Sequence, residues 1–121
     1  MDKLTRYREI IEEIFRENAS IPFAHGDLTI QPLFDHTKDH YALLVFGMEG
    51  DQWVHFCIAH VDIADTKFVI QWDSGEYSIA QELFDRGVPD EDMVQAFRPY
   101  LQQYKRLEDK QKQEKQLAGV S

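Results

Sequence analysis

Five polar residues, Tyr41, His60, Asp62, Gln71 and Asp73, have the types and spacing that could do chemistry if one sheet face brings them together. One imidazole and two carboxylates could hold a divalent ion or transfer protons, which is the basis of an alternative function, a metal-dependent hydrolase using His60, Asp62 and Asp73. The same residues could form a hydrogen-bond network within an interface. We favour the network because no nucleophile or oxyanion site accompanies the group. We therefore predict an interface or regulatory group with no catalytic residue, no metal and no cofactor.

A second string, His55-x-Cys57-x-x-His60-x-Asp62, has the residue types of a metal site. On a regular strand, side chains alternate between faces, so the first two would point away from the last two. We therefore predict that Cys57 is a small core residue and that His55 is a hydrogen-bonded core histidine. The remaining histidines lie in or near loops and are predicted to face solvent: His25, His36 and His40.

The elements that must position these residues are three runs rich in Val, Ile, Phe, Tyr and Trp between His40 and Asp73. Short turn signals at Gly50-Asp51 and Asp65-Thr66 separate them, a pattern typical of an antiparallel meander. Pairing Glu49 with Gln52 and Ala64 with Lys67 sets the register, and cross-strand partners share a face.

This register predicts one face for the core and leaves the five polar residues on the other. The predicted core face carries Leu44, Phe46, Met48, Trp53, Cys57, Ala59, Val61, Ile63, Phe68, Ile70 and Trp72, with His55 as its polar member. The opposite face is also rich in apolar side chains: Leu43, Val45, Val54, Phe56, Ile58 and Val69. Since a sheet that is apolar on both faces leaves neither to water, we expect a partner surface to cover the second face.

The flanking segments predict helices and one edge strand. The apolar stripe over residues 3–19 predicts a helix, and Pro32 restricts residues 27–35 to an edge strand. Ser78 and Gln81 form a capping box for a second helix that Gly87 closes, and Asp90 is expected to cap a third. The fold class is α+β: an N-terminal helix, a four-stranded antiparallel meander with strand 67–73 as its other edge, and C-terminal helices on one face. We expect one domain over residues 1–121, in which 105–121 is a polar tail or helix end.

Composition and charge exclude several classes of protein. No apolar run approaches the roughly 20 residues that span a bilayer, and the charged N-terminus lacks the apolar block of a secretory signal. A single cysteine, Cys57, fits a reducing cytoplasm, so we expect a cytoplasmic protein without a membrane partner. The net charge of −9 is opposite to what tight, direct nucleic-acid binding needs, and favours a basic protein partner.

Ordered segments of the chain resemble the XisI family, the cyanobacterial fdxN element excision controlling factor proteins. The segments that carry the resemblance are Leu4–Ile11, Asp39-His40-Tyr41 leading to Gly47, His60–Ile63, Ile70-Gln71-x-Asp73, Ile79–Leu83 and Gly87–Asp92. All five polar residues named above fall within these segments. The chain departs from the family pattern at Asp65-Thr66, at Phe68-Val69 and in the ending after Pro99.

The resemblance implies an accessory or regulatory protein that acts with an XisH-like partner to control excision of a DNA element, a site-specific DNA rearrangement. Such a protein would work by protein–protein binding beside a recombinase, and would not itself be an enzyme. Self-association through the second sheet face is a further expectation. An antitoxin-like inhibitor of a nuclease-fold partner is an alternative, as is the hydrolase described above.

Overall fold

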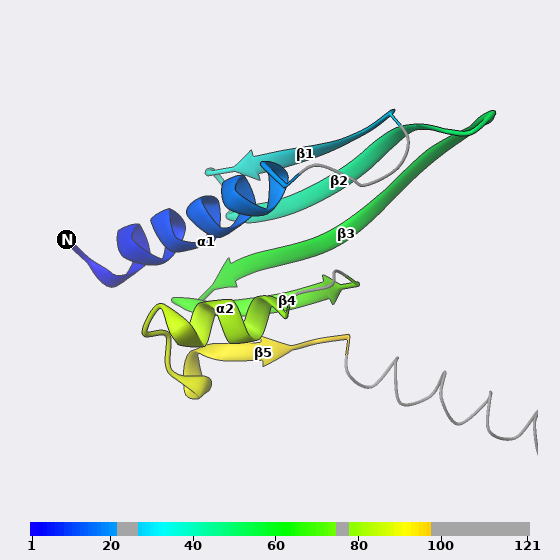
Figure 1. Cartoon of the computed structure of the whole chain (residues 1–121). Coiled ribbons are helices and arrows are strands. Elements are labelled where there is room, and N and C mark those ends of the chain that lie inside the picture. Colours follow the sequence, from blue (N-terminus) through cyan, green and yellow to red (C-terminus); the bar gives the residue numbers. More distant parts are fainter. Residues whose placement is uncertain (22–26, 75–77, 98–121) are drawn as a thin grey trace, which may run out of the picture.

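A five-stranded sheet with two helices on one face is seen in the computed structural model, which describes residues 1–21, 27–74 and 78–97 (Figure 1). The elements are α1 (Lys3–Ala19), β1 (Asp27–Asp35), β2 (His40–Glu49), β3 (Gln52–Ala64), β4 (Lys67–Asp73), α2 (Ile79–Asp85), a 3-10 turn η1 (Asp90–Asp92) and β5 (Met93–Gln95). The sheet order is β1-β2-β3-β4-β5; the first four strands are antiparallel and β5 runs parallel to β4. The α+β class is confirmed, and the four-stranded meander becomes a five-stranded mixed sheet.

The predicted N-terminal helix is confirmed as α1. Asp2 caps it, because its carboxylate accepts from the backbone N–H of Thr5 at 2.7 Å. Its apolar stripe buries Tyr7, Ile10, Ile11, Ile14 and Phe15 against the sheet. The predicted capping of α2 is also confirmed, since the Ser78 hydroxyl accepts from the Gln81 N–H.

Both predicted hairpin turns are confirmed, with Glu49 opposite Gln52 and Ala64 opposite Lys67. Asp65 and Thr66 both have positive φ, +52° and +56°, which is the backbone of the turns that join twisted hairpins. Pro32 lies in β1 at the sheet edge, as predicted.

Two irregularities change the register inside the strands. Leu44 pairs with Cys57 but Leu43 with Ala59, so Ile58 is an extra residue in β3. Likewise His60 pairs with Trp72 but Val61 with Ile70, so that Gln71 is extra in β4. An inserted residue reverses the alternation on one strand relative to its neighbour.

The predicted core face is therefore correct in part. Its members Ala59, Val61, Ile63, Phe68 and Ile70 are buried beneath the helices, whereas the core residues of β2 are Tyr41, Leu43 and Val45. The face opposite the helices, hereafter the outer face, carries residues wrongly predicted for the core: Leu44, Phe46, Met48, Trp53, His55 and Cys57. Trp72 was also predicted for the core face; it is half-buried and lies edge-on to Phe97.

The predicted third helix is wrong. A single 3-10 turn follows Pro89, and Met93, Val94 and Gln95 then pair with β4. The unpaired edge of β4 offers hydrogen bonds that an isolated helical turn cannot match, so tertiary pairing decides the conformation. Because β5 pairs with it, β4 is an inner strand, and the prediction that strand 67–73 forms the second edge of the sheet is wrong. The predicted polar tail, 105–121, lies outside the described residues.

No helix within the described ranges combines the length and apolar character that crossing a membrane requires.

Candidate functional site

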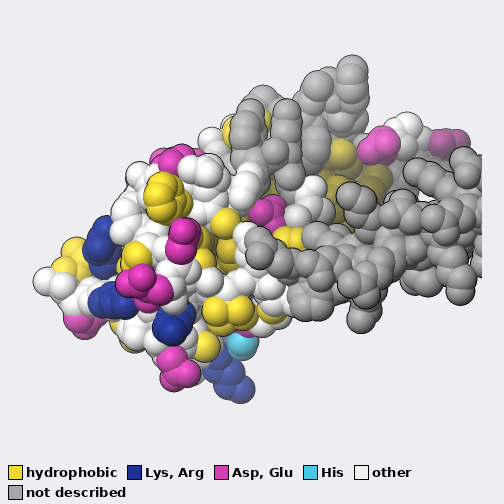
Figure 2. Space-filling view, turned by 90° about the horizontal axis from the view of Figure 1, so that it is seen from below, with side chains coloured by type: hydrophobic (Ala, Val, Ile, Leu, Met, Phe, Trp, Pro, Cys, Tyr) yellow, Lys and Arg dark blue, Asp and Glu magenta, His cyan; other side chains and the backbone are white. Residues whose placement is uncertain are grey.

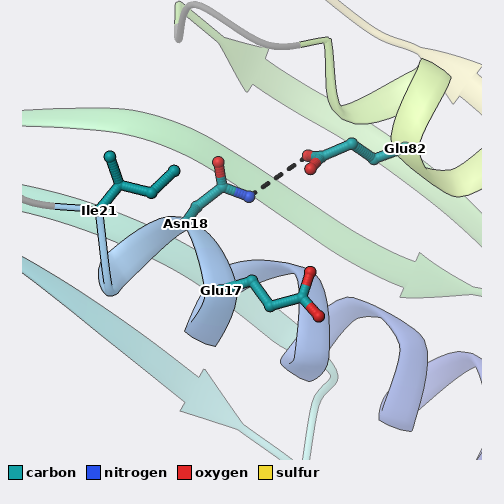
Figure 3. A pocket seen from close by; sticks show the side chains of 4 residues that line it. All are labelled: Glu17, Asn18, Ile21 and Glu82. Carbon is teal, nitrogen blue, oxygen red and sulfur yellow. Dashed lines mark hydrogen bonds between the residues drawn. The ribbon is translucent and has the colours of Figure 1, made fainter.

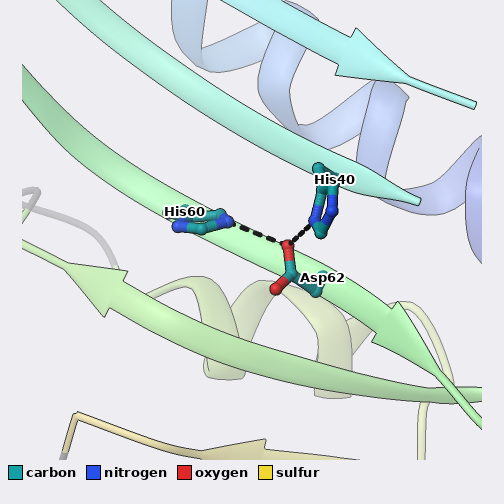
Figure 4. Close-up of side chains that lie close together, drawn as sticks. All are labelled: His40, His60 and Asp62. Carbon is teal, nitrogen blue, oxygen red and sulfur yellow. Dashed lines mark hydrogen bonds and ion pairs between the residues drawn. The ribbon is translucent and has the colours of Figure 1, made fainter. Parts of the chain in front are cut away.

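Three of the five predicted site residues meet on the outer face, together with His40, which was predicted to face solvent and is half exposed. Nδ1 of His40 and Nε2 of His60 lie 2.7 and 2.8 Å from the same oxygen, Oδ1 of Asp62 (Figure 4). Gln71 donates from Nε2 to the other oxygen, Oδ2, at 3.1 Å. We call these four residues the His–Asp cluster.

The bulge at Ile58 creates this arrangement. Beyond it, Ala42 pairs with His60 and His40 pairs with Asp62, so the side chains of His40, His60 and Asp62 emerge on one face of two adjacent strands. An unbroken register would have placed Tyr41 beside His60 instead. His40 was missed for this reason, because no residue type within Cys57–Ala59 indicates the bulge in the sequence.

Tyr41 was predicted in the group and lies on the opposite face. It is fully buried, and its hydroxyl donates to Oδ1 of Asp39 at 2.9 Å. Arg8 of α1 donates two hydrogen bonds, of 2.7 and 2.9 Å, to the same carboxylate. Tyr41 therefore belongs to a contact that fastens α1 to the start of β2.

Asp73 was also predicted in the group and has a different structural role. Its Oδ2 accepts from the backbone N–H of Ile79 at 2.9 Å. A carboxylate at the first turn of a helix satisfies an otherwise unpaired N–H and favours the helix dipole. Asp73 thus helps to begin α2 and is not part of the His–Asp cluster.

The charges within the cluster support one another. Burial alone would raise the pKa of Asp62, but the hydrogen bonds from His40 and Gln71, with the contribution of His60, lower it below its usual value. The hydrogen bond to Asp62 and its negative charge raise the pKa of His40. The His40 and His60 side chains are 51% and 39% exposed, whereas the Asp62 side chain is 16% exposed. The carboxylate is therefore partly buried, and the two imidazoles are accessible to solvent.

The prediction that His55 and Cys57 point away from His60 and Asp62 is wrong, because the same bulge reverses the alternation between the two pairs. All four side chains emerge on the outer face. The Cys57 thiol is nevertheless turned to its own strand, where it donates to the Ala59 carbonyl at 3.2 Å, and burial raises its pKa. His55 lies against the ring of Phe46, with ring centroids 6.3 Å apart.

The outer face also exposes large apolar side chains. Trp53 is 65% exposed at the β2–β3 hairpin, and Met48 opposite it and Leu33 on β1 are exposed as well. The hairpin reaches beyond the helices (Figure 1). Viewed from the β5 edge, acidic and basic side chains are interspersed with hydrophobic ones among the described residues, without a continuous basic stripe (Figure 2).

A hollow of about 240 Å³ lies on the helical side, lined by Glu17, Asn18, Ile21 and Glu82 (Figure 3). Asn18 donates both to the Ile14 carbonyl at 2.8 Å and to Glu82 at 3.3 Å, and so connects the two helices. Burial raises the pKa of Glu82. The Asn18 amide and the Glu82 carboxylate thus form a hydrogen bond with each other, which is typical of a contact between two helices.

Comparison with known proteins identifies the family. A family model described as XisI protein matches residues 1–114. The chain belongs to the XisI family.

Solved structures agree with this assignment. A XisI-like protein from Anabaena variabilis ATCC 29413 is 31% identical with a TM-score of 0.72, over 84% of this chain and 94% of that one. The fdxN element excision controlling factor XisI from the same organism is 30% identical with a TM-score of 0.65, over 79% of this chain and 93% of that one. Among curated proteins, no match was found.

Several segments that suggested the XisI family from sequence contact one another in the fold. Besides the Arg8–Asp39 pair, Tyr7 on α1 donates to Oδ2 of Asp92 at 2.5 Å, and Lys3 lies 2.7 Å from the same oxygen. These contacts hold α1 to the sheet and to η1, which accounts for their residues structurally. The His–Asp cluster bridges only neighbouring strands on the exposed face, and is thus the better candidate for a functional group.

Proposed function

We propose that this XisI-family chain is an accessory protein that controls excision of a DNA element and acts by binding a second protein. The family match and the similarity to an fdxN element excision controlling factor support the role in excision. The observation that carries the binding mode is the outer face, where Trp53, Met48 and Leu33 are exposed and the His–Asp cluster lies at the other end of β2 and β3 from Trp53. An exposed apolar patch with polar groups is typical of a protein-binding surface.

The binding surface in this proposal is the outer face. Its apolar part is Trp53, Met48 and Leu33, and its polar part is the His–Asp cluster. Aromatic side chains at the centre of an interface commonly supply much of the binding energy. The partner we propose is an XisH-like protein, and the net charge of −9 favours a basic surface on it.

Binding of the purified XisH-like protein from the same organism tests the proposal, with Trp53→Ser as the variant. Loss of an aromatic side chain that an interface buries costs about 2 kcal/mol or more, so we expect the Kd to rise by roughly 30-fold, measured by isothermal titration calorimetry. Phe84→Ser is the matched control, because Phe84 is an exposed aromatic residue on α2, on the helical side. Unchanged affinity in Trp53→Ser, or an equal loss in Phe84→Ser, would refute the outer face as the binding surface.

A further inference from the structure

We propose that His40, His60 and Asp62 bind a divalent transition-metal ion, with Zn²⁺ as the best fit, at the outer face of the sheet. The inference does not depend on the role in DNA excision, since it rests on the chemistry and positions of three side chains. Two imidazole nitrogens and one carboxylate are a donor set that suits zinc, and three protein ligands leave one coordination position open.

The geometry is close to that of a metal site. One ligand atom from each residue lies within 4.8 Å of the others. Zinc bonds to nitrogen and oxygen are about 2.0–2.2 Å, which places neighbouring tetrahedral ligands about 3.4 Å apart. The present contacts of 2.7 and 2.8 Å between nitrogen and oxygen would have to open by roughly 0.6–0.7 Å. Small rotations of two partly exposed imidazoles are sufficient for this.

The surroundings support the site. Gln71 donates to Oδ2 of Asp62 and so orients the carboxylate with Oδ1 towards both imidazoles. At metal centres, residues beyond the ligands commonly orient the ligands through hydrogen bonds of this kind. The three ligands come from the paired strands β2 and β3, where His40 lies opposite Asp62 and His60 two residues before it, and strands hold ligands more firmly than loops. The exposed imidazoles give an ion direct access from solvent.

Taken together, the charged side chains near His40 do not disfavour the binding of a cation. Asp35 adds negative charge near His40, and Lys38 adds positive charge, so the two act in opposite directions. The carboxylate of Asp62 and the net charge of −9 then favour the divalent ion. The open position faces outward, where water or a donor atom of a bound partner can complete the coordination.

Calorimetric titration of the full-length, chelator-treated protein with zinc chloride tests the proposal. We expect one equivalent to bind, and thermal melting to shift upward with zinc because the ion binds the folded state. His40→Ala and His60→Ala should each weaken binding by more than the roughly 10- to 100-fold expected for Gln71→Ala, which removes only a supporting hydrogen bond. His55→Ala is the matched control, since His55 lies on the same face of β3 but outside the cluster.

Cobalt substitution provides a second readout that does not require any variant to be stable. Co²⁺ at a site with histidine and carboxylate ligands should give visible d–d absorption that stoichiometric zinc abolishes. Less than one equivalent of zinc bound by the native chain, or wild-type affinity in both His40→Ala and His60→Ala, would overturn the proposal. An equal loss of affinity in His55→Ala would overturn it as well.

Discussion

The hydrogen bond between Tyr7 and Asp92 joins the two ends of the described chain, and its removal by Tyr7→Phe should destabilise the fold. Tyr7 is 2% exposed, stacks on Phe68 with ring centroids 4.7 Å apart, and donates to Oδ2 of the buried Asp92. Phenylalanine keeps the stacked ring and removes only the hydroxyl. The variant therefore leaves a buried carboxylate with the exposed Lys3 as its remaining charged partner.

The pKa of Tyr7 sets the scale of the expected effect. Burial, followed by the hydrogen bond to Asp92, raises this pKa from 10.0 to about 12. Two pKa units correspond to about 3 kcal/mol, and burial is the largest single cause, so the hydrogen bond accounts for only part of this energy. We therefore expect Tyr7→Phe to lower the free energy of unfolding by about 1.5–3 kcal/mol, the usual contribution of a hydrogen bond to a charged group.

Urea unfolding followed by far-UV circular dichroism measures this effect. Lys3→Gln is the control, because the Lys3 side chain is half exposed and an exposed ion pair contributes at most about 1 kcal/mol. The pH dependence gives a second check. The raised pKa of Tyr7 means that its contribution is complete below pH 10 and is lost as the pH rises towards about 12, so the difference between wild type and Tyr7→Phe should close over that range. A smaller effect for Tyr7→Phe than for Lys3→Gln, or a difference that persists to high pH, would refute the reasoning.

Four further predictions concern stability, each checked by denaturant or thermal unfolding. Gly47→Ala should destabilise by more than about 1 kcal/mol, because φ is +141° and a Cβ would collide with the Asp27 carbonyl oxygen; Gly50→Ala should cost less, since φ is +65° and its Cβ would meet open space. Ile11→Ala should cost about 2–5 kcal/mol, whereas Ala at the half-buried Leu4 should cost less. Arg8→Lys should lower the melting temperature, because a lysine cannot reproduce the two parallel hydrogen bonds to Asp39. Acid should destabilise the protein through Asp92, whose pKa is lowered by the hydrogen bonds from Lys3 and Tyr7. Its contribution is complete above pH 4 and lost as the pH falls through the lowered pKa, so Asp92→Asn should show a smaller decline in acid.

The following results would contradict these predictions. Gly47→Ala and Gly50→Ala of the same stability would mean that the close approach of β1 to β2 is not tight. Full stability of Arg8→Lys would mean that the Asp39 contact does not fasten α1. A decline in acid that is unchanged in Asp92→Asn would assign acid sensitivity to other carboxylates.

Local signals predicted the elements that depend on neighbours in the chain. The apolar stripe of α1, the capping of α2 by Ser78, the two hairpin turns and the edge position of Pro32 are all as expected. Each depends on the spacing of apolar residues, on a cap or on a turn backbone, which a few adjacent residues decide. The strand β5 could not be predicted in this way, because a three-residue strand is stable only against the edge of β4.

The candidate site shows the same division. His60 and Asp62 were found together from sequence because alternation along a strand is regular over short distances, and Gln71 reaches them from the irregularity in β4. His40 was missed, and Tyr41 and Asp73 were misplaced. A single extra residue at Ile58 reverses the faces of β2 relative to the far half of β3.

The fold class, the family and the paired hairpins depend on patterns that recur along the chain, and the residues alone therefore predicted them. Which face of each strand is covered depends instead on contacts between elements that are distant in the chain. That outcome follows from two bulges whose residues have no distinctive type, and from helices that can cover only one side of the sheet. It is this choice of face that places two imidazoles on one partly buried carboxylate and buries the tyrosine expected beside them.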